Sequence, residues 1–211
     1  MNRLKKMIGT IFIGILLTNC TTSEKPKNFD YGEITANVYS NNFFNFKIKI
    51  PTDWVILKQS QQTSLLEKGN NVTREEETVK ASEINMANLL NVFQYEIGSE
   101  VNFNPSIIIY AENNNNKPEI IRTGDEYLNQ AKKDLMQTQL RYEYISEKTE
   151  KEIIDNTHFY KIETHTLTAK DSIKQRYYAT VVNGFSLLII ITYTTEEQEK
   201  ILLEAIHSIK M

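Results

Sequence analysis

The residue best suited to chemistry in this 211-residue chain is Cys20, its only cysteine. A thiolate is a strong nucleophile that can take up a thioether-linked lipid, and a lone cysteine cannot form a disulfide within its own chain. A cationic segment with Arg3, Lys5 and Lys6 precedes an apolar run over residues 7–17, and Cys20 follows shortly after it. As a helix this run is about 16 Å long, too short for a hydrocarbon core of ~30 Å and typical of a secretory signal.

The stretch Leu17-Thr18-Asn19-Cys20 resembles the lipobox of bacterial lipoproteins, in which the cysteine becomes the lipidated first residue of the mature chain. Asn19 stands where Gly, Ala or Ser is usual. The resemblance implies cleavage between Asn19 and Cys20 and two or three acyl chains on Cys20, and two chains anchor a protein stably. We therefore predict a signal peptide over residues 1–19, export, and a lipid anchor in the bacterial envelope. A free thiol or an intermolecular disulfide is the alternative role of Cys20.

The remaining reactive side chains form no recognisable catalytic or metal site in the sequence. His158 and His165 are seven residues apart in a predicted strand, whose period of two sends them to opposite faces. His207 falls near the end of the last predicted helix, and Glu75 to Glu77 fall in the first turn of another, where each charge suits the helix dipole. Nucleotide-binding, zinc-protease and serine-hydrolase motifs are absent from the sequence. We predict no catalytic residue, no metal and no cofactor.

The net charge limits the possible classes of partner, and the chain length limits the number of domains. Removal of residues 1–19 takes away three cations and no acid, so the formal net charge moves from −3 to −6. This balance excludes a polyanion partner such as nucleic acid. Residues 20–32 are predicted to be the lipidated cysteine and a flexible tether, whose polar part spans at most ~35 Å. Residues 33–211 are predicted to form a single domain. No Asp follows Cys20 directly, which favours the outer over the inner membrane in a host with two.

Alternation of apolar and polar residues predicts the strands of that domain. In the first half they are at 34–38, 44–50, 89–97 and 106–112. Four successive strands follow at 142–155, 158–167, 172–182 and 185–193, joined at Asp155-Asn156, at 169–171 and at Asn183-Gly184. Asn-Gly favours a type I′ hairpin turn. The last strand is apolar nearly throughout, which predicts a central strand covered on both faces.

Capping boxes predict three helix starts: Thr73 with Glu76, Thr123 with Glu126, and Thr194 with Glu197. The C-terminal helix has an apolar stripe formed by Ile201, Leu202, Ala205, Ile206 and Ile209. Asn113 to Asn116 are predicted to form a loop tip.

The eleven tyrosines either fill half-buried sheet positions or form an interface. By strand period, Tyr142 and Tyr144 share one face of their strand, and Tyr177 and Tyr178 point to opposite faces.

The order of these elements resembles the PsbP-like fold. A Phe-x-Ile-x-Ile-Pro-x-x-Trp pattern is formed by Phe46, Ile48, Ile50, Pro51 and Trp54. It precedes a helix, a strand entered through Asn104-Pro105, a second helix, an antiparallel meander and a closing helix. The resemblance implies an α+β fold over residues ~33–211, an α/β/α sandwich with a mainly antiparallel central sheet flanked by helices. Proteins of that fold include photosystem accessory proteins, a nuclear import factor and bacterial exported or secretion-adaptor proteins. Their roles concern binding and assembly, and the fold has no shared catalytic motif.

The sequence therefore favours a non-enzymatic accessory protein, held at the membrane through Cys20, that binds another envelope protein. Two alternatives remain open. One is a carrier of a small apolar or lipid ligand in a cleft between sheet and helix. The other is an envelope hydrolase whose carboxylates come from distant segments.

Overall fold

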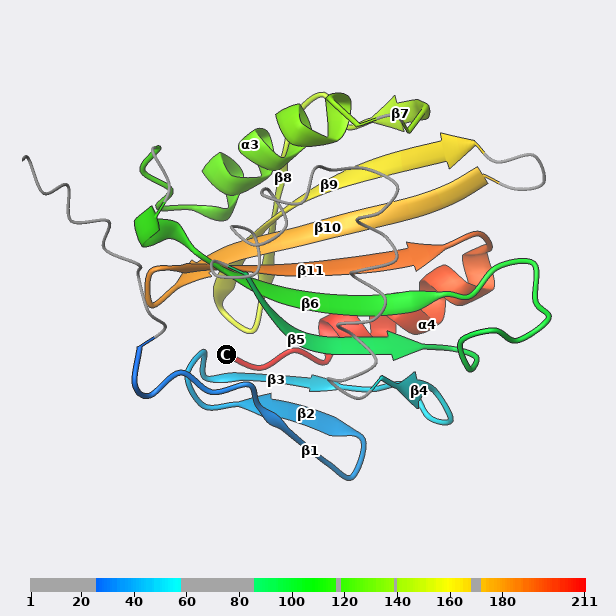
Figure 1. Cartoon of the computed structure of the whole chain (residues 1–211), viewed down its shortest axis with the longest axis horizontal. Coiled ribbons are helices and arrows are strands. Elements are labelled where there is room, and N and C mark those ends of the chain that lie inside the picture. Colours follow the sequence, from blue (N-terminus) through cyan, green and yellow to red (C-terminus); the bar gives the residue numbers. More distant parts are fainter. Residues whose placement is uncertain (1–25, 58–85, 117–118, 139, 168–171) are drawn as a thin grey trace, which may run out of the picture.

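The computed structural model describes residues 26–57, 86–116, 119–138, 140–167 and 172–211. These residues form an α+β fold with two antiparallel sheets and two α-helices (Figure 1). The smaller sheet has three strands in chain order, β1 (Glu33–Thr35), β2 (Val38–Asn41) and β3 (Phe46–Lys49).

The larger sheet has eight strands, and every paired neighbour is antiparallel. Its order is β4-β5-β6-β11-β10-β9-β7, and β8 pairs with the part of β9 that β7 leaves free. The strands are β4 (Val55–Ile56), β5 (Met86–Phe93), β6 (Ser106–Asn113), β7 (Tyr142–Ile145), β8 (Glu150–Ile154), β9 (Thr157–Leu167), β10 (Ser172–Val182) and β11 (Phe185–Tyr193).

Different elements cover the two faces of the larger sheet. On one face α3 (Gly124–Met136) packs over β9 and β10, with Leu128 buried beside Ile162. On the other face lies α4 (Glu196–His207), behind the sheet in Figure 1, where Leu202 is buried in one core with Ile189 of β11 and Phe46 of the smaller sheet. The predicted α+β fold, with a mainly antiparallel sheet between helices, is confirmed.

The predictions for β11 and for the turns at Asp155-Asn156 and Asn183-Gly184 are confirmed, whereas the joint predicted at 169–171 lies outside the described residues. β11 lies in the middle of the larger sheet, and its Ile189 side chain is fully buried. Asn183 and Gly184 turn the chain with φ angles of 52° and 79°, as a type I′ hairpin requires. Asp155 and Asn156 do the same between β8 and β9, with φ angles of 47° and 64°.

Two strand predictions are wrong. Residues 142–155 form two strands, β7 and β8, which pair with different parts of the same edge of β9. The connection between them, residues 146–149, is not part of either strand. Residues 34–38 are the tight β1–β2 hairpin, in which Ala36 and Asn37 have φ angles of 49° and 58°. Ala36 fits the apolar alternation, but the pairing of Thr35 with Val38 closes the turn around it.

The tyrosine prediction for β7 is also wrong. A β-bulge places Tyr142 opposite Thr166 and Tyr144 opposite His165. Successive residues of a strand point to opposite faces, so these two tyrosines do not share a face. Tyr177 and Tyr178 do point to opposite faces, because they are buried in the two different cores.

The capping box predicted for α3 is confirmed, since Thr123 Oγ1 accepts from Glu126 N at 3.2 Å and Glu126 Oε2 accepts from Thr123 N at 3.1 Å. The box of α4 is one residue later than predicted and consists of Thr195 and Gln198. The helix start predicted at Thr73 lies outside the described residues. Neither described helix has both the length and the apolar character needed to cross a membrane.

The asparagine run packs against a hairpin and is not the predicted loop tip. β6 ends at Asn113 and continues into the 3-10 helix η1 (Asn114–Asn116). Asn114 is buried; its backbone N donates to the carbonyl oxygen of Gly184 (3.0 Å), and Ser186 Oγ donates to its side chain (2.9 Å). The run therefore supports the β10–β11 turn.

Packed structure begins before residue 33, in the segment that the sequence assigned to the tether. The Phe29 ring lies 5.1 Å from the Phe43 ring and 5.3 Å from the Phe185 ring, measured between centroids. Asp30 accepts from the backbone N of Gly32 (2.7 Å) and of Asn42 (2.9 Å). The ordered domain thus includes Phe29, and at most about 30 Å of extended chain separates Phe29 from Cys20.

Candidate functional site

The residues singled out in the sequence are not brought together. Asn19 and Cys20 lie outside the described residues, so the cleavage site and the lipid anchor stay predictions. His158 and His165 occupy opposite faces of β9, as predicted, and His207 lies in the last turn of α4, with its Nε2 3.3 Å from Glu152. In the part of the chain that the structure describes, no three His, Cys, Asp or Glu side chains are grouped so that they could hold a metal ion.

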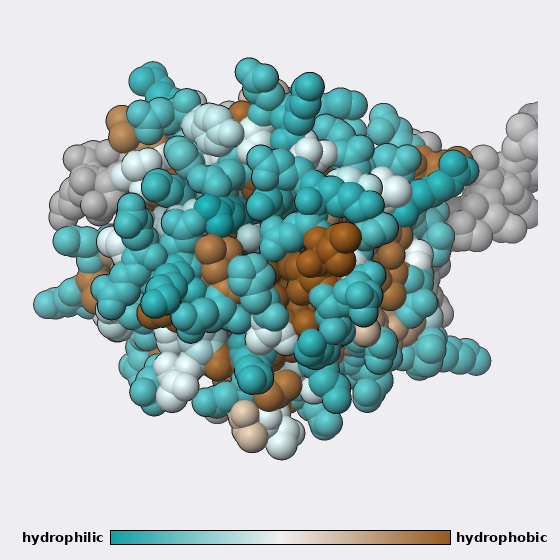
Figure 2. All heavy atoms as spheres, turned by 180° about the vertical axis from the view of Figure 1, so that it is seen from behind, coloured by the Kyte–Doolittle hydropathy of each residue, from teal (hydrophilic) through white to brown (hydrophobic). Residues whose placement is uncertain are grey.

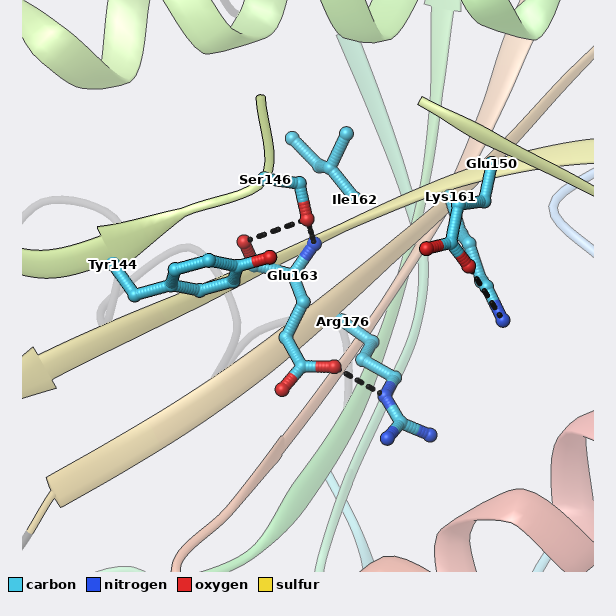
Figure 3. Close-up of a pocket in the computed structure, with 7 residues that line it drawn as sticks. All are labelled: Tyr144, Ser146, Glu150, Lys161, Ile162, Glu163 and Arg176. Carbon is cyan, nitrogen blue, oxygen red and sulfur yellow. Dashed lines mark hydrogen bonds and ion pairs between the residues drawn. The ribbon is translucent and has the colours of Figure 1, made fainter. Parts of the chain in front are cut away.

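A polar pocket lies beside β9, at the point where the connection between β7 and β8 moves away from the edge of that strand (Figure 3). Its volume is about 190 Å³, and its walls are Tyr144, Ser146, Glu150, Lys161, Ile162, Glu163 and Arg176. Ser146 fixes this departure, because its Oγ accepts from Glu163 N (2.8 Å) and its own N donates to the carbonyl oxygen of Glu163 (2.9 Å). From α3, Lys132 Nζ donates to the carbonyl oxygen of Glu147 (2.7 Å) and holds the same segment.

An ion-pair network forms the charged wall of the pocket. Arg176 Nε donates to Glu163 Oε2 at 2.9 Å, and its Nη2 donates to Glu199 Oε1 in the first turn of α4. His165 Nε2 lies 2.7 Å from Glu163 Oε1, and the Tyr144 ring lies against His165 with its centroid 4.9 Å away. Arg176 and Glu163 face each other on β10 and β9, so sheet register brings them together.

The network sets the protonation of its members. Burial by itself raises the pKa of Glu163, but the hydrogen bonds from His165 and Arg176, and their positive charge, hold that pKa below its ordinary value. Burial by itself lowers the pKa of Arg176. The hydrogen bond to Glu163 and the neighbouring negative charges outweigh this effect and raise that pKa above its ordinary value. Burial also raises the pKa of Tyr178 to about 12 and raises that of Tyr193. Glu163 therefore stays ionised and Tyr178 stays neutral at pH 7.

The chemistry of this pocket is that of a charge-compensated support. Both carboxylate oxygens of Glu163 are occupied, and its lowered pKa is the opposite of what a general acid needs. Lys161 is likewise paired, with its Nζ 3.1 Å from Glu152 and 3.5 Å from Glu150. The network joins β9 and β10 to α4, and it presents no unpaired acid to a substrate.

A second concave site lies at the end of the sheet where β5 passes into β6. It is a cleft of about 490 Å³ between the 94–105 loop and the N-terminus of α4, lined by Tyr95, Glu100, Val101, Asn102, Phe103, Thr194, Thr195 and Gln198. Three large apolar side chains of the loop are exposed: Tyr95 by 40%, Ile97 by 49% and Val101 by 40%. We refer to it below as the loop–α4 cleft.

The rear face of the molecule, which carries α4, is mostly polar. Figure 2 shows hydrophilic side chains over most of this face and a group of apolar side chains near its middle. On α4 itself, Ile201 and Leu203 are half-buried, and Leu203 packs against the main core.

Sequence reasoning did not identify either site. The pocket exists because residues 146–149 leave β9. Residues 146–152 are all polar, and this interruption of the apolar-polar pattern was a signal for the break. The opposition of Glu163 and Arg176 follows from the β9–β10 register, which the predicted joint at 169–171 does not define. For the cleft, one signal was present: Tyr95 and Ile97 continue the apolar pattern of β5 beyond Phe93, where the strand ends.

No protein-family model and no curated protein matches this sequence. Among solved structures, the chain is similar to LpqN of Mycobacterium tuberculosis, described as involved in cell envelope biogenesis. The two are 10% identical; the match covers 79% of this chain and 82% of LpqN, with a TM-score of 0.42. A likeness of this degree establishes neither a family nor a function for this chain, and the PsbP-like resemblance stays a prediction.

Proposed function

We propose that this protein is a bacterial envelope lipoprotein, anchored through lipid on Cys20, that binds another envelope protein and catalyses no reaction. The observation that carries the binding role is the 94–105 loop, which exposes three large apolar side chains beside a cleft. Two of them, Tyr95 and Val101, line the cleft together, and contiguous exposed apolar surface is typical of protein interaction sites. The anchoring role rests on the cationic segment, the short apolar run and the lone cysteine at the start of the chain.

The closed ion-pair network supports a non-enzymatic role. A hydrolase with two carboxylates needs one of them as a proton donor with a raised pKa. The pKa of Glu163 is lowered instead, and its two oxygens are bound to Arg176 and His165. Glu150 and Glu152 are both paired with Lys161.

The carrier alternative receives less support from the described cavities. The loop–α4 cleft, at about 490 Å³, has the volume of a small-ligand pocket (~300–1,000 Å³), but most of its lining residues are polar, which does not suit an apolar ligand. The cavity along the seam between the smaller sheet and β5 measures only about 220 Å³. Polar Asn88 and Glu33 are among its lining residues, beside apolar Leu90 and Ile56. We therefore place protein binding ahead of ligand transport.

Metabolic labelling tests the anchor. Wild-type protein, expressed in a bacterium that processes lipoproteins, should incorporate labelled palmitate and partition into detergent. Cys20→Ser should lose the label and keep the mass of the uncleaved precursor, because the thioether cannot form. Equal labelling and equal mature mass of the two proteins would remove the lipoprotein assignment.

Crosslinking of the lipidated protein in its native envelope tests the binding role. Reproducible capture of the same protein, identified by mass spectrometry and lost on competition with the untagged domain, is the expected result. Recovery of bound lipid without protein would favour the carrier. Turnover of an envelope polymer, abolished by one Asp or Glu substitution that leaves the melting curve unchanged, would establish the hydrolase.

A further inference from the structure

The exposed part of the 94–105 loop has a fixed backbone. Asn104 clamps its base, since its Oδ1 accepts from Tyr95 N (2.9 Å) and its Nδ2 donates to the carbonyl oxygen of Tyr95 (2.8 Å). At the tip, Ser99 N donates to the carbonyl oxygen of Glu96 (3.1 Å), and Gly98 supplies a φ of 93° that other residues rarely adopt. Apolar side chains on such a loop are presented without a further ordering cost, which favours binding.

The opposite wall of the cleft is equally well fixed. Gln198 Oε1 accepts from the backbone N of Thr194 (2.9 Å) and of Thr195 (3.3 Å), so the first turn of α4 is locked to the end of β11. The volume of about 490 Å³ between these walls is within the ~300–1,000 Å³ range of sites that accept a compact ligand. One or two large side chains of a partner fit such a space.

Both walls of the cleft carry exposed acids, of which Glu100 lines the cleft itself. Glu96 and Glu100 are exposed on the loop, which has no Lys or Arg between residues 94 and 105. Glu196 and Glu197 are exposed in the first turn of α4. The helix dipole accounts for acids at an N-terminus, but it does not account for the two on the loop. The lining of the cleft combines polar residues with the apolar side chains of Tyr95, Val101 and Phe103. With exposed acids on both of its walls, the cleft is complementary to apolar side chains flanked by cations.

The cleft faces away from the point where the chain enters the domain. Phe29 packs on Phe185 at the start of β11, and Thr194 of the cleft follows the end of β11. The nine-residue strand puts about 27 Å between them. Figure 1 shows the described chain starting, in dark blue, at one end of the molecule and the β5–β6 loop at the other. A lipid bilayer is also not expected to bind at the loop–α4 cleft, because the acids on its walls repel anionic headgroups.

We infer that the loop–α4 cleft binds a segment of a partner protein that presents one or two large apolar side chains flanked by Lys or Arg. This inference rests on the proposed function and adds the place and the chemistry of the interaction.

The first test uses a synthetic peptide with a Leu-Trp-Leu centre flanked by lysines, titrated into the full lipidated protein in phosphatidylcholine nanodiscs. Replacement of the lysines by glutamates should weaken binding at least about tenfold, and the difference should shrink at high salt. The double variant Glu96→Lys with Glu100→Lys should reverse the preference. The matched double variant Glu119→Lys with Glu143→Lys changes two exposed acids elsewhere by the same charge and should behave as the wild type.

Equal effects of the two double variants would overturn the inference, because binding would then follow net charge alone. Nanodiscs that contain phosphatidylglycerol attract the lysine-flanked peptide by themselves. After correction for the peptide that empty nanodiscs of this composition bind, the affinity for the protein should be unchanged. Loss of peptide binding to the protein in these nanodiscs would mean that the cleft takes the lipid surface, which also overturns the inference.

Photocrosslinkers at two exposed positions, Val101 in the cleft and Ile153 on β8, test separately whether the protein binds a partner and whether the cleft is the binding site. Capture of one envelope protein from Val101 and not from Ile153 is the expected result. Capture from Ile153 alone keeps the proposed function and overturns the cleft, and capture from neither position overturns both.

Discussion

Replacement of Arg176 by Met should destabilise the domain, because it removes the cation that Glu163 and Glu199 share. The three side chains are only 20%, 29% and 21% exposed, respectively. A charge-assisted hydrogen bond contributes about 1.5–3 kcal/mol when it is buried. Partial exposure reduces the contribution of each of the two bonds of Arg176, to Glu163 and to Glu199, to ~1 kcal/mol. The expected loss is therefore about 2 kcal/mol, or ~4–8 °C in Tm for a chain of this size.

The loss should depend on pH in a defined direction. The pKa of Glu163 is lowered in the folded protein, so its contribution is present above the unfolded-state pKa of ~4.3. It disappears as the pH falls through the lower folded value, because the protonated carboxyl no longer attracts Arg176. The difference in unfolding free energy between wild type and Arg176→Met should be full at pH 7 and shrink below about pH 4.

Urea unfolding followed by circular dichroism at both pH values measures this difference. Lys200→Met removes an exposed cation from α4, the helix that contains Glu199; it is the matched control and should change stability by less than ~0.5 kcal/mol. Equal stability of Arg176→Met and Lys200→Met at pH 7 would refute the reasoning. A deficit that stays constant down to pH 3 would show that lost packing, and not the ion pairs, is responsible.

Three further substitutions test the fold. Ile189→Asp puts an unpaired charge into the fully buried centre of β11 and should abolish cooperative thermal unfolding; a normal melt by circular dichroism would remove Ile189 from the core. Gly124→Ala should cost about 1–3 kcal/mol in denaturant titration, because a Cβ there collides with the carbonyl oxygen of Ala179, whereas Gly→Ala in a free helix stabilises. Tyr193→Phe should leave stability unchanged or raise it by up to ~1 kcal/mol, because the buried hydroxyl has no hydrogen-bond partner among the described residues; a clear loss would mean that it has one.

Local signals in the sequence were sufficient for the second half of the sheet. The Asn183-Gly184 turn allows little else than a hairpin, and the apolar residues of β11 need cover on both faces. Thr123 and Glu126 likewise fix the start of α3 through bonds between near neighbours. In each of these cases the deciding contacts lie within a few residues or within one hairpin.

The failures have long-range causes. The strand predicted at 142–155 is broken by contacts that Ser146 makes with Glu163 and by a contact from Lys132 of α3. The alternation of apolar residues has no information about these partners. The bulge that separates Tyr142 from Tyr144 has the same origin, since only pairing with β9 reveals it. The polar pocket was not predictable because its walls come from four strands, β7, β8, β9 and β10.

The two sites meet in the first turn of α4. Glu199 of that turn points to Arg176 and ties the helix to β10, while Glu196 and Glu197 remain exposed beside the loop–α4 cleft. The acids of this one turn therefore differ in role, since Glu199 holds the helix to β10 and Glu196 and Glu197 remain exposed to solvent. The position of one cleft wall then depends on Arg176, which does not line the cleft, because the ion pair fixes where α4 begins. If the loop–α4 cleft binds a partner as proposed, the ion-pair network contributes to that binding by positioning one wall of the cleft.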